Sequence, residues 1–139
     1  MITKIYMSWE DFGIALEELI EDIKSFPYKL YDGVYGIPRG GLSIAVALSH
    51  RLGLPLLEDF EVTNETLIVD DINDTGKTLL GAAQTNDIAT LYSTPWSVVK
   101  PLFFVRHKVS KDTWIIFPWE DWDYKTLFND KTQFKGDSE

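Results

Sequence analysis

Two adjacent aspartates stand just before a glycine-bearing turn in the stretch LIVDDINDTGKTLL, residues 67–80. Asp70 and Asp71 follow an apolar run, so the end of a buried segment would hold two carboxylates that repel one another and resist desolvation. Vicinal hydroxyl groups or a hydroxyl-bound Mg²⁺ ion would relieve that repulsion. The pair therefore predicts a ligand that offers hydroxyls or a metal to the acids.

The turn DTGKT, residues 74–78, has the composition of an anion-binding loop. Gly76 lets the backbone approach a ligand, while successive N–H groups and the hydroxyls of Thr75 and Thr78 can surround a phosphate. It is not a P-loop, because Asp71 stands where the first glycine is needed, and the chain has no GxGxxG motif. GKT alone suits an ordinary glycine turn equally well. With the acids beside it, the turn predicts a ribose that carries a 5'-phosphate.

Hydrophobic periodicity predicts strands that alternate with helices around these motifs. An amphipathic helix begins at the N-cap Ser8, with Asp11 in a capping box, and ends near Ser25 before Pro27. In chain order, the further predicted elements are a strand at 29–37, a helix at 42–52 closed by Gly53, a strand at 66–71, a helix after DTGKT to about Ala83, and strands at 88–94, 101–105 and 113–117.

This alternation predicts an α/β fold with a doubly wound, mostly parallel sheet. Ligands bind beyond the carboxyl ends of the strands in such a sheet, so PRGG (residues 38–41) and DTGKT are expected to share one crevice. With 139 residues, of which 45% are hydrophobic, residues 1–139 are expected to form a single domain. We expect roughly the last ten residues to be frayed.

Composition narrows the class of function. The chain has 13 basic and 22 acidic residues, and its net charge of -9 argues against nonspecific nucleic-acid binding and anionic membranes. It has no cysteine, which excludes disulfides, thiolate metal sites and a cysteine nucleophile. No apolar run approaches the length of a membrane span, so a cytoplasmic protein is expected.

The stretch VDDINDTGKT resembles the phosphoribosyl pyrophosphate (PRPP) signature of type I phosphoribosyltransferases. YMSWEDF, GIPRGGL and DTWIIFPWE resemble the N-terminal helix, pyrophosphate loop and base-binding segment of the xanthine-guanine and hypoxanthine branch. These pieces run in order from Tyr6 to Asp123. The resemblance implies the type I phosphoribosyltransferase fold with a small hood from the N- and C-terminal segments. It also implies transfer of phosphoribosyl from PRPP to a nucleobase, with a 6-oxopurine (hypoxanthine, guanine or xanthine) as the expected base, in purine salvage.

Roles for individual residues follow from the resemblance. It implies that Asp70 and Asp71 hold the ribose hydroxyls, and that Arg39, Gly40 and Gly41 receive the pyrophosphate through a loop that often has a strained or cis peptide. A surface salt bridge is the alternative for Arg39. The residues implied to hold the 5'-phosphate are Asp74, Thr75, Gly76, Lys77 and Thr78.

The same resemblance implies a site for the base and for Mg²⁺. Asp74 corresponds to the acid near the purine imidazole, as general base or proton acceptor, although a helix cap is nearly as plausible. Trp114 would stack on the base and the Ile115 backbone would read its edge, whereas a core position is the alternative for this tryptophan. Mg²⁺ would be held by Asp70 and Asp71, with Glu120 at a second metal or its waters. Relatives commonly pair subunits, so a homodimer is one arrangement.

Three positions depart from the family pattern. Thr94, a candidate base-binding residue, stands where relatives have a lysine that donates to the exocyclic oxygen, and Lys100 or Lys108 could substitute for it. The segment EDFEVTNE (58–65) is much shorter than the mobile lid of relatives, and Ile116 replaces an acid of some xanthine-reading enzymes. These departures leave two alternatives: a PRPP- or nucleotide-binding module with weak or no turnover, and transfer to another base such as a pyrimidine.

Overall fold

The first helix forms where the sequence predicts it. In the computed structural model, which describes residues 1–26 and 29–120, α1 (Trp9–Lys24) follows the N-cap Ser8. The Ser8 hydroxyl accepts a hydrogen bond from the Asp11 N–H at 3.0 Å, and the Asp11 carboxylate accepts one from the Ser8 N–H at 3.1 Å. This reciprocal cap contributes about 1 kcal/mol to helix stability.

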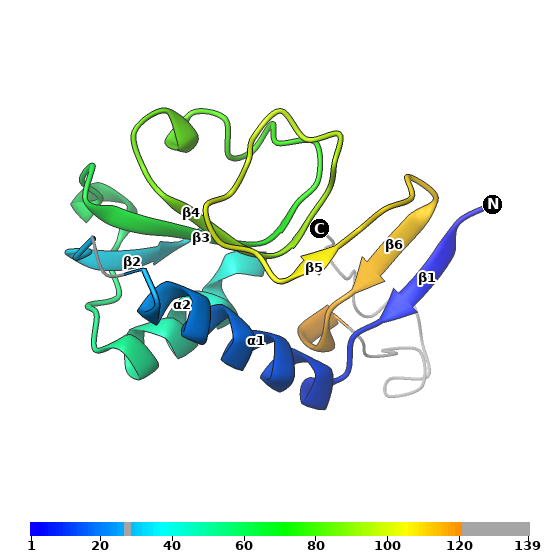
Figure 1. Ribbon diagram of the computed structural model, residues 1–139, viewed down its shortest axis with the longest axis horizontal. Coiled ribbons are helices and arrows are strands. Elements are labelled where there is room, and N and C mark those ends of the chain that lie inside the picture. The colour runs from blue at the N-terminus through cyan, green and yellow to red at the C-terminus, as the bar shows by residue number, and fades with distance from the viewer. Residues whose placement is uncertain (27–28, 121–139) are drawn as a thin grey trace, which may run out of the picture.

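The strands form a four-stranded main sheet and a separate two-stranded hood (Figure 1). The main sheet has the order β2-β3-β4-β5, the hood pairs β1 with β6, and every pairing is parallel. In chain order the helices and strands are β1 (Thr3–Tyr6), α1, β2 (Gly33–Gly36), α2 (Gly40–Leu52), β3 (Thr66–Asn73), β4 (Ile88–Ser93), β5 (Arg106–His107) and β6 (Thr113–Ile116). The predicted parallel α/β sheet is thus confirmed.

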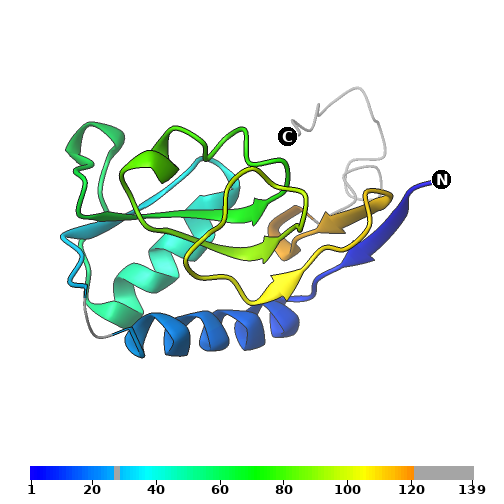
Figure 2. The ribbon, with the colours of Figure 1, turned by 45° about the horizontal axis from the view of Figure 1, so that its top comes forward.

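Both long helices cover the same face of the main sheet (Figures 1 and 2). The apolar stripe of α1 packs there together with residues of α2 and of the inner strands, and each fully buried large side chain contributes about 1.5–3 kcal/mol. The stripe is the predicted one: Phe12, Ala15, Leu16, Leu19, Ile20 and Ile23 are all buried. This layer fixes the position of β3, the strand that carries the acid pair.

The opposite face of the sheet is covered by loops, and one predicted helix is absent there. After the DTGKT turn the chain makes turns and a short 3₁₀ helix, η2 (Ala82–Gln84), instead of an α-helix to Ala83. Gly76 has a φ of 89°, which lies outside the helical region, so the helix cannot begin within the DTGKT turn. The segment still contributes to the core, because Leu79 packs with Ile68 and Ile88 in a second buried cluster.

Two strand predictions also need correction. Residues 101–105 run beside β4 with an isolated bridge between Phe103 and Ala89, whereas regular pairing begins only at β5. Pro101, which has no N–H to donate, disfavours an earlier start. Strand β1 is not predicted by periodicity, because all four of its residues are exposed and it lacks an apolar alternation.

The hood is attached to the rest of the molecule through aromatic rings. Phe12 of α1 meets Trp119 edge-on with ring centroids 5.3 Å apart, and Tyr92 of β4 meets Phe117 at 6.0 Å. Residues 121–139, which include the end expected to be frayed, lie outside the described residues. No helix within residues 1–26 and 29–120 combines the length and the apolar character that crossing a bilayer requires.

Candidate active site

The acid pair lies in the second half of β3. The side chain of Asp70 is 8% exposed and that of Asp71 is half-buried, and the Asp71 N–H donates to Asp70 Oδ1 at 2.9 Å. Burial, followed by the negative charge of Asp71, raises the pKa of the Asp70 carboxyl to about 8. Ionising both carboxylates is therefore unfavourable without a ligand, as the sequence predicts, and Asp71 is the more accessible of the two.

The PRGG loop lies directly against this pair. A β-carbon on Gly40 would fall 2.5 Å from the Asp71 carboxyl carbon, and one on Gly41 would collide with the Val69 carbonyl oxygen. The Ile37 N–H donates to that same carbonyl at 2.9 Å, which ties the loop to β3. The peptide bond between Pro38 and Arg39 is cis, and the Arg39 side chain is exposed. The loop and the acids thus form one site, as predicted.

The DTGKT turn forms the next part of the site. At Gly76 the left-handed φ of 89° and a close approach to Ser97, whose Oγ would lie 2.6 Å from an added β-carbon, both require glycine. The Thr75 carbonyl accepts from the Val98 N–H at 3.1 Å, which holds the turn against the following loop. The side chains of Thr75, Lys77 and Thr78 are exposed. The turn therefore presents hydroxyl, ammonium and N–H groups at the surface, a composition suited to an anion.

Sequence reasoning missed Asn73, which anchors this turn. Its side-chain amide donates to the Ser93 hydroxyl at 3.0 Å and to the Val99 carbonyl at 2.8 Å. Its amide oxygen accepts from the Ser97 hydroxyl at 3.0 Å, so this fully buried side chain is satisfied on both ends. The one signal in the sequence was an amide directly after an apolar strand, which is too common to single out.

The carboxylate of Asp74 accepts hydrogen bonds from two side chains that the sequence does not indicate as its partners. Its Oδ1 accepts from Trp96 Nε1 at 2.9 Å and its Oδ2 accepts from Lys108 Nζ at 2.7 Å. The Thr94 hydroxyl donates to the Asp74 backbone carbonyl. The donor of Thr94 is therefore directed at the backbone of Asp74, and a lysine from beyond β5 supplies the nearby positive charge.

Two further predicted base residues belong to the hood. Trp114 and Ile115 lie on β6 in the hood, which is a separate sheet from the one that carries the acids. Trp114 is 57% exposed, so the alternative of a core tryptophan is wrong, whereas Ile115 is buried and pairs with Ile5 of β1. A stacking role for Trp114 stays a prediction.

The predicted metal residues are not all together. Within the described residues, no three histidine or acidic side chains converge as a metal site, so Glu120 does not join Asp70 and Asp71. Instead, Glu120 Oε1 accepts from the Phe117 N–H at 3.0 Å and caps the 3₁₀ turn that follows β6. The adjacent carboxylates still fit Mg²⁺, which proteins usually hold through one or two carboxylates together with substrate phosphates.

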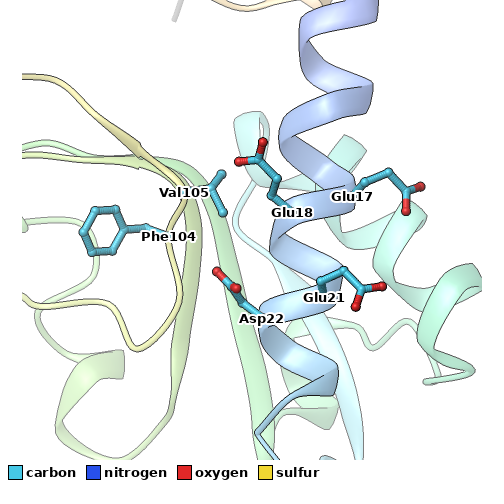
Figure 3. Close-up of a pocket in the computed structure, with 6 residues that line it drawn as sticks. All are labelled: Glu17, Glu18, Glu21, Asp22, Phe104 and Val105. Carbon is cyan, nitrogen blue, oxygen red and sulfur yellow. The ribbon is translucent and has the colours of Figure 1, made fainter.

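A hollow beside α1 shares no residue with this site (Figure 3). Its lining residues are Glu17, Glu18, Glu21, Asp22, Phe104 and Val105. Two of these carboxylates already have partners, because Glu18 is 2.6 Å from Arg106 and Glu17 pairs with Arg51. The hollow is acidic and unsuited to a phosphate, so the acid pair with its two loops is the candidate active site.

Relatives of known function match most of the chain. The xanthine-guanine phosphoribosyltransferase of Nitratidesulfovibrio vulgaris is 31% identical over 78% of this chain and 84% of its own length. That of Desulfotalea psychrophila is 27% identical over 78% of this chain and 86% of its own length. No protein-family model matches the sequence.

Solved structures agree with these relatives. The purine phosphoribosyltransferase of Pyrococcus horikoshii superposes with a TM-score of 0.71 at 30% identity, over 86% of this chain and 95% of that one. The xanthine-guanine-hypoxanthine phosphoribosyltransferase of Helicobacter pylori, at 21% identity, shares the fold with a TM-score of 0.71 over 92% of this chain and 100% of that one. With the acid pair and both loops in the expected order, the chain belongs to the type I phosphoribosyltransferases, in their xanthine-guanine and hypoxanthine branch.

Proposed function

We infer that this protein transfers the 5-phosphoribosyl group of PRPP to a purine base and releases pyrophosphate, a reaction of purine salvage. The observation that carries this inference is the contact between the PRGG loop and the acid pair, with Gly40 against Asp71. That contact puts donors for a diphosphate beside acceptors for a sugar diol. We further propose that the preferred base is a 6-oxopurine, namely hypoxanthine, guanine or xanthine.

The binding roles that we propose follow the chemistry of each group. Asp70 and Asp71 accept hydrogen bonds from the ribose hydroxyls, and the backbone N–H groups and side chains of residues 74–78 hold the 5'-phosphate. The exposed guanidinium of Arg39 and the N–H groups of Gly40 and Gly41 receive the pyrophosphate. The rigid anchoring of Asn73 supports this assignment, because it fixes the phosphate turn relative to the strand that carries the acids.

In the reaction, a purine ring nitrogen bonds to the anomeric carbon while the bond from that carbon to the pyrophosphate oxygen breaks. The ring proton passes to Asp74, whose carboxylate is partly exposed, and the electron pair of the broken bond leaves with pyrophosphate. The transition state resembles an oxocarbenium ion, so alignment of the reactants and neutralisation of the leaving group dominate catalysis. Arg39 and the loop N–H groups neutralise part of that charge.

Purine phosphoribosyltransferases generally use Mg²⁺ with PRPP. Asp71, the more accessible acid, would hold the ion together with Asp70, and the ion would supply charge neutralisation on the departing diphosphate. A role for Glu120 at a second metal or its waters stays a prediction, and Oε1 of this carboxylate accepts from the Phe117 N–H.

A base-panel assay tests the proposed function. The protein is incubated with PRPP, Mg²⁺ and hypoxanthine, guanine, xanthine, adenine or uracil, and pyrophosphate release is followed. Release that requires a 6-oxopurine, and that Asp71→Asn abolishes, supports the proposal. Tight PRPP binding without release under any condition would contradict it and support a binding module instead. A base-free reaction measures hydrolysis, which the short segment 58–65 is expected to permit.

Broader predictions accompany this proposal. We propose that residues 1–139 form one domain, which is supported by a main apolar cluster whose members, among them Met7, Leu67 and Phe117, come from most of the described length of the chain. A cytoplasmic location and a homodimer stay predictions, and light scattering on the purified protein tests the second. The protein is expected to bind neither nucleic acid nor membranes, as its net charge of -9 favours.

A further inference from the structure

The loop of residues 94–99, which follows β4, lies along the phosphate turn. The Thr94 N–H donates to the Asn73 carbonyl at 3.1 Å. The Val98 N–H donates to the Thr75 carbonyl, also at 3.1 Å. These two backbone hydrogen bonds fix the loop against the turn, one on either side of position 74.

The loop gives the turn the support that a helix would otherwise provide. Bends and turns occupy residues 74–81, so no α-helix holds the backbone of this segment. The orientation of a functional side chain on such a segment is fixed by packing and by hydrogen bonds from other parts of the molecule. Asp74 needs this support most, since its side chain is 38% exposed and its carboxylate is the proposed proton acceptor.

Trp96 is the side chain through which the loop reaches the Asp74 carboxylate. Its Nε1 donates to Asp74 Oδ1 at 2.9 Å, while Lys108 Nζ donates to Asp74 Oδ2 at 2.7 Å. The two donors come from different segments and bind different oxygens, so together they fix the plane of the carboxylate. An ionised carboxylate accepts about four hydrogen bonds, so both oxygens can still accept from a substrate.

The indole ring of Trp96 is itself held in place. It is half-buried, and the amines of two lysines lie over it, with Lys108 Nζ 5.9 Å and Lys111 Nζ 5.4 Å from the ring centroid. Cation–π contacts of this kind contribute about 0.5–1 kcal/mol at exposed sites. They use the face of the ring, whereas the bond to Asp74 uses its N–H. Packing and positioning thus depend on different parts of one side chain, and a substitution can separate them.

Building on the proposed function, we propose that Trp96 is a positioning residue whose indole N–H holds the Asp74 carboxylate in the orientation that accepts the purine ring proton. Trp96 acts through Asp74 and does not itself need to touch the substrate. Without the N–H, Lys108 still binds one oxygen, so the carboxylate keeps a partner but can turn about that contact. Proton transfer from the base then slows, because the acceptor is no longer aligned with its donor. PRPP binding is preserved, since the backbone hydrogen bonds between the loop and the turn remain.

Trp96→Phe tests this inference, because it removes the N–H and keeps an aromatic ring beside the lysines. The rate of a single turnover with hypoxanthine should fall by about 10- to 100-fold, while the Kd for PRPP stays unchanged. Trp96→His should recover a large part of the rate, since imidazole Nε2 occupies the same place on a five-membered ring as indole Nε1. The matched control is Trp9→Phe in α1, the same change at a tryptophan that is 62% exposed, which should leave the rate unchanged.

An unchanged single-turnover rate in a folded Trp96→Phe protein would overturn the inference. Equal losses in Trp96→Phe and Trp96→His would also overturn it, because the size of the ring and not its N–H would then matter. Thermal melting establishes which variants fold. If Trp96→Phe does not fold, Trp96→Met replaces it, since a flexible thioether side chain adapts to an irregular gap.

A wild type that turns over no base would refute the proposed function separately. Calorimetric binding of hypoxanthine in the presence of PRPP and Mg²⁺ then decides the role of Trp96, because the ring N–H of the bound base still needs its acceptor. Weaker binding by Trp96→Phe than by the wild type supports the inference. Equal binding, or no binding by either protein, overturns it.

Discussion

The backbone of Gly40 lies against the carboxyl group of Asp71, with no room for a side chain between them. This contact joins the first turn of α2 to the acidic end of β3, and it brings together two residues that are 31 positions apart in sequence, from 40 to 71. The distance from the pyrophosphate loop to the sugar acids is therefore set by a backbone contact. Backbone contacts of this kind are less adjustable than contacts between long side chains.

Gly40→Ala should weaken PRPP binding, because the added methyl group must displace either the loop or Asp71. We expect at least a 10-fold rise in the KM for PRPP, about 1.4 kcal/mol. The control is Gly13→Ala in α1, where an added β-carbon meets nothing within 4 Å and should stabilise the helix by about 1 kcal/mol. An unchanged KM for PRPP in Gly40→Ala would show that the contact has no role in binding.

Asp70→Asn should stabilise the protein, and more so as the pH rises. The pKa of Asp70 is raised to about 8 from an ordinary value near 3.9, so the folded state binds more protons than the unfolded state in that window. Folding stability is then lost as the pH rises through it, and an asparagine removes this loss. We expect a gain on the order of 1–3 kcal/mol at pH 8.5 and a smaller gain at pH 5, measured by urea unfolding.

Asp71→Asn provides the comparison for this pH dependence. It removes the repelling neighbour but leaves Asp70 buried, and burial is the larger cause of the raised pKa of Asp70. The pH dependence of unfolding should therefore shrink only in part. Equal pH profiles for the wild type and Asp70→Asn would contradict the electrostatic account of the pair.

Asp74→Asn should abolish most of the activity while the protein still folds. Loss of a positioned proton acceptor corresponds to a fall of about 10²- to 10⁴-fold in kcat. Because Lys108 would lose its ionic partner, the free energy of unfolding should also fall by about 1–3 kcal/mol. Steady-state kinetics and urea unfolding measure the two effects, and full activity in Asp74→Asn would exclude Asp74 as the acceptor.

Asn73→Ala should destabilise the fold more than any single-hydroxyl change around it. The substitution removes three hydrogen bonds of a buried side chain and leaves Ser93, Ser97 and the Val99 carbonyl short of a partner. With about 1–3 kcal/mol for each of the three buried groups left unsatisfied, we expect a loss of at least roughly 3 kcal/mol. Ser93→Ala, which removes one of these bonds, should have about half the effect or less. Comparable losses in the two variants would mean that the network is not anchored at Asn73.

The sequence predicted the features that depend on interactions between residues close together in the chain. The capping box at Ser8, the apolar stripe of α1 and the end of α2 at Gly53 depend on residues within a few positions of one another, and all three are confirmed. The prediction that the PRGG loop lies beside Asp70 and Asp71 is confirmed by the contact of Gly40 with Asp71. By contrast, the helix expected after DTGKT was wrong, because tertiary packing buries its apolar residues through turns.

The parts that were missed depend on contacts distant in sequence. Lys108 meets Asp74 across 34 residues, and nothing in the spacing of either residue indicates that contact. The resemblance predicts Thr94 as a base contact, whereas its hydroxyl donates to the Asp74 backbone carbonyl. Strand β1 is exposed throughout, so it has no apolar pattern and exists only because β6 offers it an edge.

The pairing of β1 with β6 brings Thr3 beside Thr113. The two strands of the hood therefore come from opposite ends of the described sequence. During translation at about 5–20 residues per second, the N-terminal strand waits for several seconds before its partner leaves the ribosome. Strands β2, β3 and β4 can assemble with both helices in that interval, since they precede β6 by 20 residues or more in the chain. Completion of the hood is thus expected to be the last step in the maturation of this protein, and its N-terminal residues stay available to chaperones until then.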